Sequence, residues 1–272
     1  MARSRAAGSR GGRRTMNVTV EYNEEGTVAT WWLDRPEARN AVNLAMWEAL
    51  CEAADAANQN PDVRVVIIRG RGRHFSAGAD IASLGRTLAA DHDGSSYRAT
   101  NLAAERAIST LRMPTIAVIE GFCVGGGVQI ALACDIRIAD SGSTFGVTPA
   151  RLGISYPVVA LQRLVAIAGM GLATELLLAG EMISATRAAA TGLIQHVTDD
   201  LDQSVNEMVS ALLQRSPFTQ SATKQLLNAM IDAVDIADLG RAMEQDSLTS
   251  PDLDEGLAAF GEKRPPRFIY RP

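Results

Sequence analysis

The chain has few cysteines and histidines, the residues that usually form disulfides in a small secreted fold or bind a metal. It contains three cysteines and three histidines among 272 residues. So few cysteines in a chain of this length exclude a disulfide framework and fit a reducing compartment, so we expect a cytoplasmic protein. The histidines and cysteines also lack the spacing of metal ligands, and we expect no metal site.

The chain also lacks a long uninterrupted hydrophobic run. Its most apolar window, Thr115–Cys134, contains Glu120, Gln129 and four glycines. A strand, a tight turn and a buried helix explain this window better than a membrane span does. Residues 1–16 contain five arginines and no acidic residue, and they lack the apolar stretch of a secretory signal. We expect residues 1–16 to form a disordered basic tail.

The rest of the chain has no excess of positive charge. The whole sequence has 26 basic and 31 acidic residues, for a formal net charge of −5. Without the five arginines of the tail, 21 basic residues remain against 31 acidic ones, which gives about −10. An acidic surface repels the negatively charged phosphate backbone of a nucleic acid, so we expect no nucleic-acid partner. A hydrophobic fraction of 47% also excludes a mostly disordered chain.

Residues 17–200 alternate between strand and helix patterns. The apolar, β-branched runs at Val63–Arg69, Pro114–Ile119 and Ile136–Ala139 are typical of strands buried on both faces. A helical spacing at Leu44–Asn58 precedes the first of them. This alternation predicts βαβ units, an α/β fold and a mainly parallel sheet. Further expected elements are the strands Val18–Glu21 and Thr27–Leu33, a helix within Ser96–Leu111, and the helix Val128–Cys134.

From Pro157 onward the pattern is mostly helical. No repeat, low-complexity segment or linker separates this part from the preceding one. We predict a folded core over residues 17–200, followed by a helical C-terminal region, residues 201–272, that serves oligomerisation. The expected helices are Val158–Ile167, Gly171–Leu178, Ala185–Ala190, Leu201–Gln214, Pro217–Ala233, Ile236–Ser247 and Asp252–Phe260.

Two segments rich in small residues leave buried strands at their carboxyl ends and enter helices. They are His74–Ile81, after the strand Val63–Arg69, and Glu120–Gly127, after the strand Pro114–Ile119. Small residues let a ligand approach the backbone, and N–H groups at a helix start point outward. On neighbouring strands, two such turns would aim two donors at one point and form an oxyanion hole. Taken alone, each segment is weak evidence, because a structural turn is the default explanation of a single glycine-rich segment.

Five short motifs follow one another between residues 35 and 264. They are RPEARNA at 35–41, VVIIRG at 65–70, FSAGADI at 75–81, GGGxQIALACDIRIA at 125–139 and EGxxAFxEKR at 255–264. Their order resembles the crotonase, or enoyl-CoA hydratase/isomerase, superfamily over residues 18–267. The resemblance implies a ββα spiral core, an acyl-CoA thioester ligand, and a trimer or a dimer of trimers. Coenzyme A would enter as part of the substrate without a separate cofactor, and the motifs do not specify the reaction.

The resemblance also implies roles for particular positions. The backbone N–H groups of Ala79 and Gly126 would form the oxyanion hole. A C-terminal helix would contact the coenzyme A of a neighbouring subunit through Phe260 and Lys263, although a solvated helix end is the alternative for Lys263. The remaining coenzyme A contacts would be Glu37, Ala38, Arg39, Ala77, Asp80 and Ile81.

Two positions depart from the pattern of the family's hydratases, which use two glutamates to deliver water across a double bond. The first position, two residues after the last glycine of the second turn, holds Gln129. The second, four residues after Phe145, holds Pro149. Neither side chain exchanges a proton near neutral pH, so we expect ordinary hydration to be impaired.

Residues 145–156 indicate an alternative reaction. Their pattern FxxTPxxLGxxY is similar to methylmalonyl-CoA decarboxylase of the same superfamily, in which the tyrosine, here Tyr156, faces the substrate. The match departs at Ala79, where that enzyme has histidine. Decarboxylation of a malonyl-type thioester forms an enolate without removing a proton from carbon, so it dispenses with the glutamate pair. Two further alternatives stay open, a Tyr156 that only packs and a non-catalytic acyl-CoA-binding protein.

Other polar residues near these motifs have structural explanations. We expect Asp80 to cap the helix that begins near Ile81. We expect Glu120 to orient the second turn or, alternatively, to reach the acyl group, and His74 to lie at the surface or at a strand end. Turn or core positions are expected for Thr148, Arg151, Cys123 and Cys134.

Overall fold

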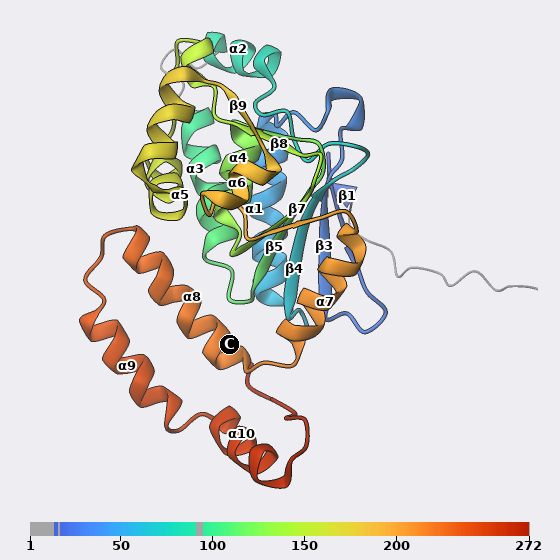
Figure 1. Cartoon of the computed structure of the whole chain (residues 1–272), viewed down its shortest axis with the longest axis vertical. Coiled ribbons are helices and arrows are strands. Elements are labelled where there is room, and N and C mark those ends of the chain that lie inside the picture. Colours follow the sequence, from blue (N-terminus) through green and yellow to red (C-terminus); the bar gives the residue numbers. More distant parts are fainter. Residues whose placement is uncertain (1–13, 16, 91–94, 272) are drawn as a thin grey trace, which may run out of the picture.

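The computed structural model describes residues 14, 15, 17–90 and 95–271, and it shows a layered α/β core joined to a helical C-terminal region (Figure 1). Most of the predicted N-terminal tail, namely residues 1–13 and 16, lies outside the described residues. Arg14 and Thr15 form β1, which pairs antiparallel with Thr19 and Val18 of β2 (Val18–Tyr22).

A seven-stranded sheet forms the centre of the described core. The pairs from the third strand to the seventh are parallel, and the first three strands pair antiparallel. This topology confirms the predicted α/β class and the mainly parallel sheet. In spatial order the strands are β1, β2, β3 (Val28–Leu33), β4 (Val65–Gly70), β5 (Thr115–Ile119), β7 (Ile136–Asp140) and β10 (His196–Thr198).

Helices cover both faces of this sheet. Successive side chains of a strand point to opposite faces, so Val66 and Ile68 of β4 belong to one buried cluster, and Val65 and Ile67 to another. The first cluster includes buried residues of α1 (Leu44–Gln59), α3 (Ser95–Ser109), α4 (Gly126–Ala133) and α5 (Val158–Ala179). The second includes Leu201 of α7 (Leu201–Leu213). Because both faces of the central strands are buried, apolar and polar residues do not alternate along them.

A second, three-stranded sheet lies within the described core and was not predicted. It consists of β6 (Phe122–Val124), β8 (Thr144–Gly146) and β9 (Met182–Ser184). The expectation of a turn throughout Gly121–Gly127 is therefore wrong for residues 122–124. Those residues become a strand because β8, more than twenty residues away in sequence, pairs with them in parallel.

The helix α5 joins two helices that the sequence predicts separately. Gly169 interrupts it with φ 80° and ψ 159°, at the predicted boundary. Within the described residues, α5 is also the one helix that is long and apolar enough to cross a membrane by length and composition. Its buried Arg163 forms an ion pair with Glu105 of α3, so we interpret α5 as a core helix.

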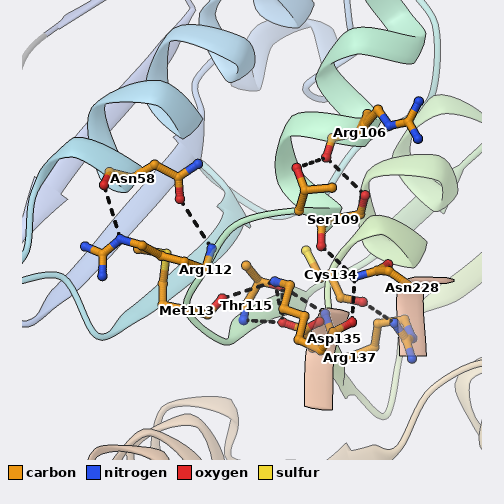
Figure 2. A network of polar contacts seen from close by, with 12 residues as sticks. Asn58, Arg106, Ser109, Arg112, Met113, Thr115, Cys134, Asp135, Arg137 and Asn228 are labelled. Atoms are coloured by element: carbon orange, nitrogen blue, oxygen red, sulfur yellow. Dashed lines mark hydrogen bonds and ion pairs between the residues drawn. The ribbon is translucent and has the colours of Figure 1, made fainter. Parts of the chain in front are cut away.

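The C-terminal region consists of α8 (Pro217–Ile231), α9 (Ala237–Ser247) and α10 (Pro251–Glu262). Polar contacts attach α8 to the core, and Figure 2 shows Asn228 beside Ser109. Asn228 Nδ2 donates to the Ser109 carbonyl at 2.8 Å, and Lys224 Nζ forms an ion pair with Asp135 at 2.8 Å. None of the residues of α9 is buried, and α9 and α10 extend away from the sheet (Figure 1). The other helices are α2 (Ile81–Ala90) and α6 (Ala185–Ala190).

Candidate active site

A cavity of about 640 Å³ lies where the two turns meet. Residues 77–79 of the first turn and 124–126 of the second line it. Another part of the wall comes from residues 148–149 and 151–157, which include residues of the short helix η2 (Pro149–Arg151). The structure therefore brings together the two predicted turns and the segment that resembles the decarboxylase.

Backbone hydrogen bonds hold the two turns side by side. Ser76 N–H donates to the Phe122 carbonyl at 2.8 Å, and Val124 N–H donates to the Ser76 carbonyl at 3.0 Å. The approach is so close that a Cβ on Gly78, where φ is 98°, would lie 2.9 Å from the Val124 carbonyl oxygen. A Cβ on Gly127 would meet the Ser76 carbonyl oxygen at the same distance. The glycines are therefore required for this contact.

Among the described turn residues that line the cavity, two have N–H groups without an acceptor in the described part of the chain, Ala79 and Gly126. The Ala79 nitrogen lies 3.7 Å from the position that a Cβ on Gly126 would occupy, so the two residues are neighbours. Gly126 begins α4, and the first N–H groups of a helix have no helical partner. The N–H groups of Gly78, Asp80 and Gly125, in contrast, are bonded within the protein. Two donors are thus available to a carbonyl oxygen in the cavity.

The loop that carries the predicted coenzyme A contacts runs beside the first turn. Glu37 and Ala38 lie on the short helix η1 (Pro36–Ala38). The Arg39 carbonyl accepts a hydrogen bond from Ala77 N–H at 2.9 Å. The buried side chain of Asn40 holds the loop in place by donating to the His74 carbonyl at 2.7 Å. Arg39 and Ala77, which are 38 positions apart in sequence, therefore lie next to each other.

His74 and Arg39 flank the ring of Phe122. The His74 ring stacks on it with the centroids 4.6 Å apart, and the Arg39 guanidinium carbon lies 5.7 Å from its centroid. Phe122 N–H donates to His74 Nδ1 at 3.2 Å. Burial lowers the pKa of His74, and the positive charges of Arg39 and Arg73 lower it further. The imidazole therefore acts as a neutral acceptor that supports β6.

Asp80 caps α2, as the sequence predicts. Its Oδ1 accepts a hydrogen bond from Ser83 N–H at 2.9 Å, and its carboxylate forms an ion pair with Arg35 at 3.0 Å. The bond from Ser83 and the charge of Arg35 hold the pKa of Asp80 below its usual range. A carboxylate occupied in this way is a poor base. The next residue, Ile81, is half exposed and lines the cavity.

A buried polar network lies behind Gln129. Its Nε2 donates to Asn101 Oδ1 at 2.9 Å and to Glu105 Oε2 at 2.7 Å. The Glu105 carboxylate also pairs with Arg163 at 3.3 Å. Burial raises the pKa of Glu105, and the bond from Gln129 and the charge of Arg163 oppose this rise. We missed Asn101 and Glu105 in the sequence, although two polar residues four positions apart share one helix face.

Pro149 and Tyr156 also line the cavity, together with Thr148. Pro149 begins η2 and offers no proton. The Tyr156 hydroxyl donates to the Gly125 carbonyl at 3.4 Å. Burial raises the pKa of Tyr156 well above 10, so its hydroxyl stays protonated. Arg151, which lines the cavity too, is exposed and pairs with Glu181 at 3.5 Å.

Glu120 differs from both roles expected for it. Its carboxylate pairs with Arg69 of β4 at 3.3 Å, and it does not line the cavity. Only its backbone supports the first turn, because its carbonyl accepts a hydrogen bond from Phe75 N–H at 2.8 Å. The reason is that Arg69, on the neighbouring strand, offers the carboxylate a charged partner away from the cavity.

Phe260 and Lys263 do not reach the cavity of their own chain. Phe260 lies in the last turn of α10 with its side chain 87% exposed, and Lys263 directly follows that helix. Cys123 and Cys134 are buried core residues, as predicted, and burial raises the pKa of Cys134 to about 12. The described part of the chain contains no group of three His, Cys, Asp or Glu side chains that could hold a metal ion.

Comparison with known proteins shows the family. The pattern of the enoyl-CoA hydratase/isomerase family matches residues 23–271. A crotonyl-CoA hydratase of Syntrophomonas wolfei is 32% identical over 264 residues, covering 94% of this chain and 98% of that protein. A mitochondrial Delta(3,5)-Delta(2,4)-dienoyl-CoA isomerase of Dictyostelium discoideum is 33% identical over 266 residues, covering 92% and 90%.

Solved structures agree with the sequence comparison. The crystal structure of an enoyl-CoA hydratase/carnithine racemase from Magnetospirillum magneticum superposes with a TM-score of 0.88. It is 31% identical and covers 95% of this chain and 97% of its own. This match confirms the predicted crotonase-like α/β fold. The chain therefore belongs to the enoyl-CoA hydratase/isomerase family.

Proposed function

We propose that this protein binds an acyl-CoA thioester and stabilises the enolate of its acyl group with the N–H groups of Ala79 and Gly126. One observation carries the proposal. The two N–H groups are neighbours at the cavity and have no acceptor among the described residues. As negative charge develops on the thioester oxygen, both donors stabilise it in a geometry that the backbone has already fixed.

In this proposal the reaction is not hydration by two glutamates. Gln129 and Pro149 occupy the positions of the hydratase glutamates, and both line the cavity. The Gln129 amide is held by Asn101 and Glu105 and carries no titratable proton. Proline has no side-chain proton at all. General acid–base catalysis at these two positions is therefore absent.

A second candidate reaction is decarboxylation of a malonyl-type thioester, and Tyr156 favours it. The Tyr156 hydroxyl lies 3.4 Å from the Gly125 carbonyl, one residue before the proposed donor Gly126. When the carboxylate leaves as carbon dioxide, the electrons of the broken C–C bond form the enolate. The oxyanion donors stabilise this enolate, and a proton is then added to its α-carbon. No base that removes a proton from carbon is needed.

We further propose that coenzyme A contacts two subunits in a trimer or a dimer of trimers. Glu37, Ala38 and Arg39, with the turn residues Ala77, Asp80 and Ile81, would bind it in one subunit. Phe260 and Lys263 would reach it from a neighbour, since they lie away from the cavity of their own chain. Exposed apolar side chains support an interface on this region. They include Leu227, Met230, Val234, Leu248, Leu257 and Phe260.

Light scattering tests the assembly. Chains of 28.9 kDa should give the mass of three or six copies at micromolar concentration. Truncation after Asp252 removes most of α10 and should weaken both assembly and coenzyme A affinity. A stable full-length monomer would refute the shared site without affecting the oxyanion hole.

Mass spectrometry with acyl-, enoyl- and malonyl-type CoA thioesters tests the function itself, because it reports both binding and conversion. Conversion identifies the reaction, whereas binding without conversion to any product identifies a carrier. Hydration of crotonyl-CoA on the order of 10 s⁻¹ would show that a carboxylate other than the missing pair does the work. If no thioester binds, the proposal fails.

A further inference from the structure

A second cavity lies away from the two turns, where residues of α4, α5, β7 and α8 meet. Its volume is about 490 Å³, and it shares no lining residue with the cavity between the turns. Small-molecule sites in proteins typically measure roughly 300–1,000 Å³. The second cavity is therefore large enough for a ligand of its own, and the proposed function gives it no role.

Three positively charged side chains, each more than nine-tenths buried, line this second cavity. They are Arg137, Arg163 and Lys224. Lys224 pairs with Asp135 at 2.8 Å, and Arg163 pairs with Glu105 at 3.3 Å. Arg137 forms no ion pair within the described part of the chain, so the three cations exceed their two carboxylate partners by one charge. Because a buried charge is costly unless it is paired, the cavity has room for one further negative charge.

The donor that is left for such a charge is Nη2 of Arg137. Nε and Nη1 donate to the backbone carbonyls of Leu193, Ala131 and Cys134 at 2.8–3.3 Å. Nη2, with two N–H groups, has no acceptor among the described residues and is not fully enclosed by them. Figure 2 shows this side chain beside Cys134 and Asp135. Two N–H groups of a charged guanidinium are therefore available in the cavity.

The rest of the wall is mostly apolar. An inorganic anion would use the charge of Arg137 but would leave this apolar surface in contact with water. A ligand that carries both a negative charge and a hydrocarbon chain satisfies both parts of the wall, as is usual for small-molecule sites. The apolar lining consists of Leu132, Ala133, Ala166, Ile167, Leu227, Met230 and Ile231.

We infer that this cavity binds a monocarboxylate with a short hydrocarbon chain, with its carboxylate on Arg137 and its chain against α5 and α8. One negative charge matches the one cation without a carboxylate partner, and the hydrogen bonds to it are charge-assisted. A second negative charge would have no free cation and would be repelled by Asp135. The site is separate from the thioester cavity, so its failure would leave the proposed function standing.

Calorimetric titration of the full-length protein with hexanoate, hexanamide and acetate tests the site. Hexanoate should bind about tenfold more tightly than hexanamide, which has the same length but no charge. It should also bind about tenfold more tightly than acetate, which has the same charge but almost no chain. Equal affinities in either comparison would refute the inference. So would a lack of hexanoate binding, the result expected if a neighbouring copy of the chain fills the cavity.

Two variants at exposed positions of α5 locate the bound hexanoate. Ala166 lines the cavity, so the ring of Ala166→Trp should occupy its entrance and weaken hexanoate binding about tenfold. Met170→Trp, four residues later and outside the lining, is the matched control and should bind hexanoate as the wild type does. Unchanged binding in Ala166→Trp would place hexanoate elsewhere and refute the site.

Asp135→Asn tests the charge of the site in the opposite direction. It removes the carboxylate that pairs with Lys224, so a second cation becomes available and hexanoate affinity should rise severalfold. Damage to the fold would lower the affinity instead, so a rise is specific to the proposed site. An unchanged or lower affinity in a folded variant would contradict the inference, and the wild-type comparison of hexanoate with hexanamide decides the matter if the variant does not fold.

Discussion

The two halves of the cavity differ in the kind of chemical group that forms them. One half is backbone, the N–H groups of Ala79 and Gly126, held by hydrogen bonds between two glycine-containing turns. The other half is side chains, chiefly Gln129, Pro149 and Tyr156. The backbone half follows the motifs of the family, whereas our proposal assigns the changes to the side-chain half. Under this proposal, the protein binds the thioester oxygen through the same backbone N–H groups as its family but differs from the family's hydratases in the side chains that would transfer protons.

The backbone half should be the more sensitive to a single substitution. Gly126→Pro removes one donor at the first residue of α4, where helices tolerate proline. The expected loss is about 2.7–4 kcal/mol of transition-state stabilisation, or roughly 10²–10³-fold in kcat. Steady-state kinetics on a substrate from the thioester screen measures it.

Gly126→Ala is the matched control. It adds a Cβ that would lie 3.4 Å from the Trp47 ring but retains the N–H, so turnover should change little. A folded Gly126→Pro enzyme with full turnover would remove Gly126 from the oxyanion hole.

In the side-chain half, Gln129→Glu alone should destabilise the protein. It places a second carboxylate where the Gln129 amide now lies, 2.7 Å from Glu105. Only one of the two can be ionised beside Arg163 without a large penalty, so the free energy of unfolding at pH 7 should fall by about 3 kcal/mol. Urea unfolding measures this. The exchange variant Glu105→Gln/Gln129→Glu keeps one carboxylate and one amide and should recover most of the loss.

A related prediction concerns the rate at which the protein hydrates crotonyl-CoA. The unmodified protein should hydrate crotonyl-CoA very slowly, because each missing acid–base group costs about 10²–10⁴-fold. Adding Pro149→Glu to the exchange variant should raise this rate. Pro149→Gln in the same background restores the backbone N–H without a carboxyl group and should not. Equal rates in the two variants would show that position 149 has no acid–base role.

Tyr156→Phe should have a smaller effect. If the hydroxyl orients or protonates an enolate, conversion of a malonyl-type thioester should fall about tenfold, as expected for one lost hydrogen bond. Binding of the thioester should stay the same, since the ring still packs. Parallel measurements of kcat and Kd separate an effect on conversion from an effect on binding. Unchanged conversion would leave Tyr156 as a packing residue.

The smallest effect should come from His74, outside the cavity. Its pKa lies below the usual 6.5, so between these two values the unfolded chain binds more protons than the folded one. The contribution of His74 to stability should therefore be constant above about pH 6.5 and fall as the pH drops below it. Urea unfolding of wild type and His74→Gln across this range should show a weaker pH dependence in the variant. Identical pH profiles would contradict the assignment.

The long strands and helices could be predicted from the sequence. Burial of both faces of a strand, or of one stripe of a helix, requires apolar residues at a regular spacing. The prediction failed for β6, β8 and β9, which have three residues each and owe their pairing to distant segments. Three residues are too few to show a period, and the glycines around β6 indicated only a turn.

The candidate site, too, could be predicted only where it depends on local sequence features. The two turns could be predicted, since strand ends and small residues are local features. The partners of Gln129 could not, because Asn101 and Glu105 meet it only through the packing of α3 on α4. Glu120 could not be oriented either, since its partner Arg69 lies on another strand.

The Glu105–Gln129 pair has a consequence for how this cavity could change during evolution. Two single steps lead from the present pair to one with the carboxylate at position 129, and each passes through a poor intermediate. Glu at both positions would crowd two acids beside Arg163, whereas Gln at both would leave that buried guanidinium without its ion-pair partner. Evolution between the form with the carboxylate at position 105 and the form with it at position 129 therefore requires one of two conditions. Either the protein is stable enough to tolerate the intermediate, or both substitutions occur together.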